Sequence, residues 1–189
     1  MKPKISVFVA TSLDGFVARH DGSLDWLDKA NKAVPKGEDC GFQNCMNSID
    51  VLVMGRVTFE QVLTFGEWPY GEKAVVVMSS REIKIPAHFQ KTVSISSESP
   101  VVLVERLFSR GAKHLYVDGG MTIQNFLQAD LIDEVTITLI PLVLGEGKPL
   151  FKAIGKDIAL IHLNTKSFDF GFVQVKYGIK KDSSQSYNQ

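Results

Sequence analysis

The sequence predicts an α/β domain with a mostly parallel central sheet, flanking helices and an antiparallel hairpin at its C-terminal end. Short runs of β-branched residues alternate with helical patterns as far as about residue 130, which is typical of parallel strands joined by crossover helices. Two later strand-like segments, 160–171 and 172–180, are joined by a glycine and favour a hairpin. Hydrophobic residues make up 44% of the chain and charged residues 22%, ordinary values for a globular domain.

The elements follow from the apolar periodicity of each segment. The helix at 101–112 is favoured by its ends, because Pro100 suits a first turn and Gly111 suits a C-terminal end, although its three valines alone would favour a strand. The other predicted helices are 38–48, 57–63 and 121–130. The predicted strands before the hairpin are 5–11, 51–54, 74–78, 92–96 and 114–118, followed by a long apolar segment at 133–145.

Length and composition narrow the possible function classes. A chain of 189 residues predicts a single domain over 1–181, with a polar, disordered tail at 182–189. Because 21 basic residues balance 21 acidic ones, we expect neither a nucleic-acid nor a membrane partner. The N-terminus lacks a signal-peptide pattern and no apolar run could span a membrane, so we expect a cytoplasmic protein. Cys40 and Cys45 are expected to be free thiols, and no metal-ligand spacing occurs.

Glycines, hydroxyl groups and arginines follow four of the predicted strands. Because ligands bind at the carboxyl ends of parallel strands, we expect these loops to form one site for a ligand that bears several phosphates. Taken singly, each loop has an ordinary explanation as a turn, a helix cap or a surface residue. The residues are Thr11, Leu13, Asp14 and Gly15; Gly55, Arg56 and Thr58; Ser79, Ser80 and Arg81; and Gly119, Gly120, Met121 and Thr122.

Five segments in order resemble the dihydrofolate reductase-like superfamily. They are "ATSLDGFVARHDGSLDWL", "MGRVTFE", "VVVMSS", "YVDGGMTIQNFL" and "LIDEVTITLIPLVLGEGKPLF". The chain is most similar to the branch that includes the reductase domain of bacterial riboflavin-biosynthesis proteins, and it looks like a small stand-alone member. The resemblance runs from about residue 5 to about residue 180 and implies the three-layer fold of that superfamily. A G-x-G-x-x-G dinucleotide motif is absent, and "GEGKPLF" does not fit a phosphate loop.

The resemblance implies NADPH as the cofactor. It implies that Arg56 lies near the adenosine 2′-phosphate, with Ser79 and Ser80 beside the same phosphate. A guanidinium group suits that role because it is permanently charged and binds phosphate through two donors. Gly119-Gly120 matches the glycine pair under the pyrophosphate and nicotinamide, and the segment from Thr11 to Gly15 matches the part that covers the nicotinamide. We expect Thr58 to cap its helix or to contact the phosphate.

The sequence leaves two interpretations of the residue that could act as the catalytic acid. The position that matches the folate enzymes' carboxylate is Asp39, at the start of the predicted helix 38–48 with Phe42 on the pocket side. A carboxylate beside an apolar ring would have a raised pKa, which suits proton delivery. Alternatively, Asp39 is a helix cap or a first-turn acid favoured by the helix dipole. Trp26 is expected to anchor a loop rather than to contact substrate.

We therefore predict an NADPH-dependent reductase that acts on a flat heterocycle or a ring-opened sugar. Substrate candidates are the ribosylaminopyrimidine of riboflavin synthesis and then dihydrofolate. No basic residues are evidently committed to a ribose phosphate, although Lys148 and Lys152 lie near the "LVLGEGKPLF" segment. The alternatives are a nucleotide-binding protein without turnover and loops that serve only as turns. A homodimer is also expected, because the family is often dimeric and "EVTITLIPLVL" is more apolar than an exposed edge.

Overall fold

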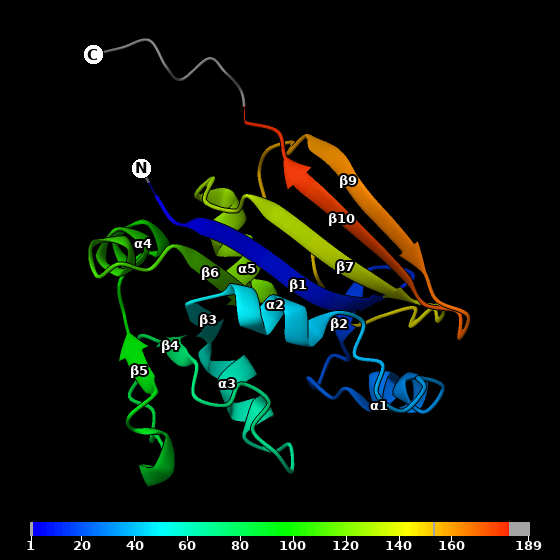
Figure 1. The fold of residues 1–189 in the computed structure, drawn as a ribbon, viewed down its shortest axis with the longest axis horizontal. Coiled ribbons are helices and arrows are strands. Elements are labelled where there is room, and N and C mark those ends of the chain that lie inside the picture. The colour runs from blue at the N-terminus through cyan, green and yellow to red at the C-terminus, as the bar shows by residue number, and fades with distance from the viewer. Residues whose placement is uncertain (1, 153, 182–189) are drawn as a thin grey trace.

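The computed structural model describes residues 2–152 and 154–181, which contain one eight-stranded sheet with the order β5-β4-β3-β6-β1-β7-β10-β9 (Figure 1). A two-stranded sheet of β2 and β8 adjoins it. The strands are β1 (Lys4–Ser12), β2 (Phe16–Ala18), β3 (Val51–Gly55), β4 (Ala74–Met78), β5 (Val93–Ser96), β6 (His114–Asp118), β7 (Glu134–Ile140), β8 (Lys148–Pro149), β9 (Leu160–Ser167) and β10 (Val173–Ile179). The helices are α1 (Asp25–Asn31), α2 (Phe42–Ser48), α3 (Arg56–Val62), α4 (Pro100–Ser109) and α5 (Gly120–Gln128), with a short 3₁₀ turn, η1 (Ala87–Phe89).

The strand directions confirm the predicted sheet. The six strands from β5 to β7 pair in parallel, whereas β10 is antiparallel to both β7 and β9. In the pairing of β3 with β6, Met54 lies opposite Asp118. The loops that follow these two strands therefore begin at the same level of the sheet edge, as ligand sites of parallel sheets require.

Helices cover both faces of the sheet, and this gives three layers. On one face the apolar sides of α4 and α5 pack on the sheet through residues such as Leu103, Leu107 and Phe126. On the other face α2 and α3 pack on it through Met46 and Phe59. Ser99 caps α4 by accepting a hydrogen bond from the amide of Val102, and Pro100 occupies its first turn, so the predicted helix forms despite its valines.

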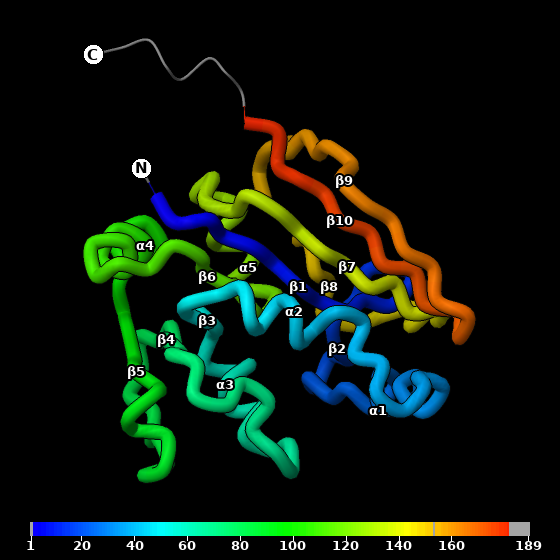
Figure 2. Tube along the Cα trace, in the orientation of Figure 1, coloured from blue at the N-terminus to red at the C-terminus, as the bar shows by residue number. Residues whose placement is uncertain are grey.

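Three predictions about the segment before β3 need correction. Helix α2 begins at Phe42 rather than at residue 38, because Cys40 (φ 52°) and Gly41 (φ 86°) are left-handed and interrupt the helical path. The sequence predicts no strand between residues 11 and 51, but this segment contains β2, which pairs with β8 (Figure 2). Trp26 lies in α1, not in a loop, and is buried against Ile140 and Phe172.

One of the two reasons given for a homodimer, the apolar segment that contains β7, is wrong, although the dimer itself stays a prediction. Strand β7 lies between β1 and β10, so its apolar residues are explained by its internal position. The open edges of the sheet are β5 and β9, and all eight residues of β9 are exposed. The tail predicted at 182–189 lies outside the described residues. Within the described part of the chain, no helix is long and apolar enough to cross a membrane.

Candidate cofactor and substrate site

A cleft of about 1650 Å³ opens at the carboxyl ends of β1, β3, β4 and β6. This volume exceeds the roughly 300–1,000 Å³ of a typical small-molecule site, so two ligands could occupy it together. Asp39 and Phe42 line it, as do most of the residues predicted to bind cofactor. These are Gly55, Arg56, Thr58, Ser79, Ser80, Arg81, Gly119, Gly120, Met121 and Thr122.

Two glycine–threonine contacts lock the loops after β3 and β6 together. A Cβ atom on Gly119 would lie 2.2 Å from the Thr58 hydroxyl oxygen, and one on Gly55 would lie 2.8 Å from the Thr122 hydroxyl oxygen. Each loop therefore supplies a glycine that makes room for the other loop's threonine. Gly119 also has φ 87°, a left-handed conformation that favours glycine. The contacts bring the starts of α3 and α5 side by side at the cleft.

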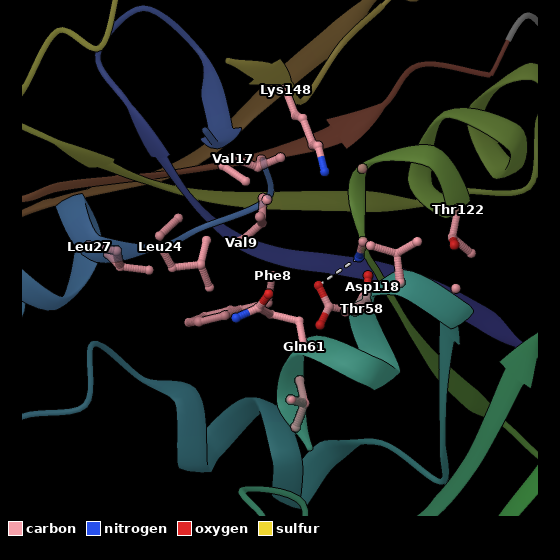
Figure 3. Close-up of a pocket in the computed structure, with 18 of the residues that line it drawn as sticks. Phe8, Val9, Val17, Leu24, Leu27, Thr58, Gln61, Asp118, Thr122 and Lys148 are labelled. Carbon is pink, nitrogen blue, oxygen red and sulfur yellow. Dashed lines mark hydrogen bonds between the residues drawn. The ribbon is translucent and has the colours of Figure 1, made fainter. Parts of the chain in front are cut away.

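Thr58 does not cap α3, contrary to one expectation. The residue that precedes the helix is Gly55, and no side chain accepts a hydrogen bond at that end. The Thr58 side chain is directed across to Gly119 instead (Figure 3). Its role in the site is therefore to fix the spacing of the two loops.

The two arginines of the cleft differ in their partners. The Arg56 guanidinium donates to both carboxylate oxygens of Glu60, at 2.8 and 2.7 Å, one helical turn away. This exposed pair orients Arg56 at the start of α3, and such pairs contribute little to stability. Among the described residues no carboxylate pairs with Arg81. The Ser79 hydroxyl donates to the Arg81 carbonyl at 2.8 Å and accepts from the Arg81 amide, so it shapes this loop.

Four predicted cofactor residues do not line the cleft. Thr11 is buried, and its hydroxyl group has no hydrogen-bond partner among the described residues. The Asp14 carboxylate accepts from the amides of Leu144 and Gly145, at 3.1 and 2.7 Å, and from the Ser12 hydroxyl. These hydrogen bonds, above all that of Ser12, lower the Asp14 pKa. Asp14 therefore ties the loop after β7 to the loop after β1, and Leu13 and Gly15 share that turn.

The expected rise in the pKa of Asp39 is wrong. Its carboxylate accepts from the amides of Gly41 and Gln43, both at 2.8 Å, and these hydrogen bonds lower its pKa. Asp39 thus serves the turn that leads into α2, as in the second of the two readings. An exposed carboxylate with a lowered pKa is a poor proton donor near neutral pH.

Asp118 is a site residue that the sequence reasoning missed. It ends β6 directly before the glycine pair and lines the cleft. The residue is partly exposed, and desolvation of its carboxyl group by the surrounding protein raises its pKa. The Gly119 amide, which donates to it at 2.7 Å, and the phenols of Tyr70 and Tyr116 offset part of the rise. The sequence does contain a feature that could have indicated Asp118, namely a carboxylate at the end of a predicted strand, directly before Gly119-Gly120.

The side of the cleft away from α5 is largely apolar. Figure 3 shows Leu24 and Leu27 on one side of Asp118 and Thr122 on the other. The rings of Phe8 and Phe42 lie there 6.4 Å apart at an interplanar angle of 59°. A ligand here would meet hydrophobic walls on one side of Asp118 and glycines and hydroxyls on the other.

The second side fits a dinucleotide. Helix α5 begins at Gly120, so its first amides lie at the cleft, where they favour an anionic group. A Cβ atom added to Gly120 would be in ordinary van der Waals contact with Val17 and the Pro149 carbonyl, at 3.5 and 3.6 Å, so β2 and β8 pack closely on the start of α5. Arg56 and Arg81 add two positive charges to the same side. No cluster of three or more metal-ligating side chains occurs among the described residues.

Comparisons with known proteins agree with this architecture. Residues 3–173 match the RibD C-terminal domain. The Bacillus subtilis (strain 168) protein YwjB is 34% identical over 172 residues, covering 89% of this chain and 94% of YwjB. YyaP of the same organism is 30% identical over 183 residues, covering 92% and 94%.

Solved structures show the same fold. A protein from Shewanella sp. PV-4 whose name links it to riboflavin biosynthesis has a TM-score of 0.87 at 38% identity, covering 96% of this chain and 100% of that one. A Thermotoga maritima diaminohydroxyphosphoribosylaminopyrimidine deaminase/5-amino-6-(5-phosphoribosylamino)uracil reductase has a TM-score of 0.72 at 16% identity, covering 95% and 57%. The chain therefore belongs to the RibD C-terminal domain family, and this membership supports a reductase-like function.

Proposed function

We propose that the protein is an NADPH-dependent reductase of a small heterocyclic or ring-opened ribosylaminopyrimidine substrate. The observation that carries the proposal is the interlocked pair of loops after β3 and β6, which place Arg56 and the start of α5 at one side of a two-ligand cleft. The cation and the amides suit the phosphates of a dinucleotide. Arg56 and Arg81 are the residues that would distinguish the extra phosphate of NADPH.

Bound NADPH would supply hydride to the carbon of a C=N or C=O group. The chain's part is to hold both ligands in register and to deliver a proton to the nitrogen or oxygen of that group. Asp118 suits this second task better than Asp39, because its pKa is raised and it lies between the two sides of the cleft. After each turnover the Asp118 carboxylate would regain its proton from solvent.

Binding and turnover can be tested separately. Wild-type protein should bind NADPH more tightly than NADH, and Arg56→Ala should remove most of that difference. A charged hydrogen bond contributes about 1.5–3 kcal/mol, so the NADPH affinity should fall roughly 10- to 100-fold while the NADH affinity changes little. Arg110→Ala, an exposed arginine that does not line the cleft, is the matched control. Equal losses for both nucleotides would contradict the role of Arg56.

A protein that binds NADPH without turnover is the second candidate. It is favoured by the placement of Asp39, whose carboxylate is committed to backbone amides. NADPH oxidation should be followed with a panel that includes 5-amino-6-(5-phosphoribosylamino)uracil and dihydrofolate. Tight NADPH binding with no oxidation of NADPH by any member would favour this candidate over the reductase.

We also keep the homodimer as a proposal, now on β9 rather than β7. Strand β9 is an open edge, and Leu160, Ile161 and Leu163 are 46%, 50% and 50% exposed on it. An exposed apolar edge strand favours pairing with a second copy.

A further inference from the structure

The positive charges that line the cleft come from the loops after β3 and β4 and from the segment around β8. Arg56 and Arg81 follow β3 and β4, at the side assigned to the cofactor. Lys148 and Lys152 belong to the segment at and after β8, which pairs with β2 and contacts α5 through the Gln124 amide. The Lys148 ammonium nitrogen lies 3.1 Å from the position of a Cβ atom on Gly22, so it borders the turn that precedes α1. Gln124 donates to the carbonyls of Pro149 and Leu150, which holds this segment over the cofactor side. A phosphate in the cleft would be attracted to this half.

The opposite end, formed by α1 and the turn before α2, has the opposite character. Glu38 and Asp39 line it, and the lining residues that the described segment 24–42 contributes include no lysine or arginine. Lys166 stands behind Glu38, with 3.9 Å between the ammonium nitrogen and the carboxylate, but it faces the Phe168 ring and does not line the cleft. It offsets part of the negative charge without offering a phosphate a direct contact.

The walls at this end are hydrophobic. Leu27 and Val34 pack against the cluster of Trp26, Ile140 and Phe172. Phe42 adds a ring to the same end. Apolar and aromatic walls favour a flat ring, which they remove from water, and they give no compensation for a desolvated dianion. Asp118, at the inner boundary, is the polar group that a ring nitrogen or carbonyl could reach.

From this division we infer that the substrate end takes an uncharged, planar nitrogen heterocycle without a phosphate group. The inference rests on the proposed function, because the proposed function assigns the side with Arg56 and Arg81 to the cofactor. A phosphate ester placed at the α1 end would lie near Glu38, Asp39 and the hydrophobic walls, and repulsion together with desolvation would weaken its binding. The substrate class therefore differs from the phosphoribosyl compound named for the Thermotoga maritima enzyme.

A matched pair of probes tests this inference. The compounds are 5-amino-6-(ribitylamino)uracil and its 5′-phosphate, titrated calorimetrically without oxygen and with saturating NADP⁺ to fill the arginine side. The phosphate-free compound should bind at least tenfold more tightly. Equal or tighter binding of the phosphate ester would overturn the inference, and so would a failure of the phosphate-free compound to bind.

Variants separate this result from the cofactor assignment. The titrations are repeated without NADP⁺ on the double variant Arg56→Ala, Arg81→Ala, which lacks the competing cations, so they decide the inference even if the protein fails to bind NADPH. Asn31→Arg, at the α1 end, should raise the affinity for the phosphate ester about tenfold and leave the other compound within twofold. Lys148→Met should change the affinities for the two compounds by the same factor. A selective loss for the phosphate ester in Lys148→Met would place its phosphate at β8 and contradict the inference.

Discussion

Substitution of Gly119 by alanine tests the interlocking of the two loops that form the cofactor side. The added Cβ would lie 2.2 Å from the Thr58 hydroxyl oxygen and 3.3 Å from the Thr58 Cβ, and the residue has φ 87°. The left-handed conformation costs an L-residue about 1–2 kcal/mol. Forced overpacking costs about 1–3 kcal/mol more. The free energy of unfolding should therefore fall by about 2–5 kcal/mol.

Two other glycines separate these contributions. Gly111 has φ 94° with no atom within 4 Å of its added Cβ, so Gly111→Ala should lose only the conformational part, about 1–2 kcal/mol. Gly55 has φ −81°, so Gly55→Ala carries only the contact with Thr122. Urea denaturation of the three variants, monitored by circular dichroism, gives the free energies. Adding Thr58→Ala to Gly119→Ala should restore the part of the unfolding free energy that was lost to the steric contact, but not the part lost to the left-handed conformation.

The result that refutes this reasoning is a Gly119→Ala variant no less stable than Gly111→Ala. Such an outcome would mean that the loops move apart without cost. The cofactor side would then not be held in place by the glycine–threonine contacts.

Three further predictions concern pH and assembly. Asp118→Asn should raise the free energy of unfolding more at pH 7 than at pH 4, because a carboxyl group whose pKa is raised by folding destabilises the protein as the pH rises. The same variant should lower the rate of NADPH oxidation about 10²–10⁴-fold without weakening NADPH binding. Equal stability gains at both pH values would argue against a desolvated carboxyl group. Desolvation lowers the pKa of His114, whose ring nitrogens contact the Ser6 hydroxyl and the Ser48 carbonyl at 2.8 and 2.9 Å. The contribution of His114 to the free energy of unfolding should therefore be full above pH 6.5 and fall as the pH drops below that value. His114→Gln should flatten this fall in urea denaturation measured between pH 5 and pH 8. Light scattering should give a dimer for the wild type and a monomer for Ile161→Lys, Leu163→Lys; a wild-type mass near 20.9 kDa would contradict the dimer.

Local patterns predicted much of the sheet edge at which we propose that the cofactor binds. Strands such as 74–78 and 114–118 are short, mostly apolar runs followed by serine, arginine or glycine, and their bounds agree with the structure. Parallel strands bring their carboxyl ends to one edge, so Gly55 and Gly119 could be placed together without coordinates. The family resemblance then suggested the cofactor for that edge.

The acid and the covering loop could not be predicted in this way, because each depends on contacts between distant segments. The Asp14 carboxylate is committed to amides about 130 residues later in the chain, which no local pattern indicates. Asp39 could equally be a proton donor or a turn residue until the left-handed backbone at Cys40 and Gly41 directed two amides at it.

The sequence by itself determined the main strands and helices of the central sheet, its parallel character, and the glycine, arginine and hydroxyl groups at its edge, since these depend on periodicity and on residues close in the chain. Only the tertiary structure decided which carboxyl group is desolvated, that Thr58 spaces two loops instead of capping a helix, and that β9 rather than β7 is the open edge. Desolvation, steric contact and edge position are properties of neighbours brought together by folding. They therefore appear only once the chain is packed.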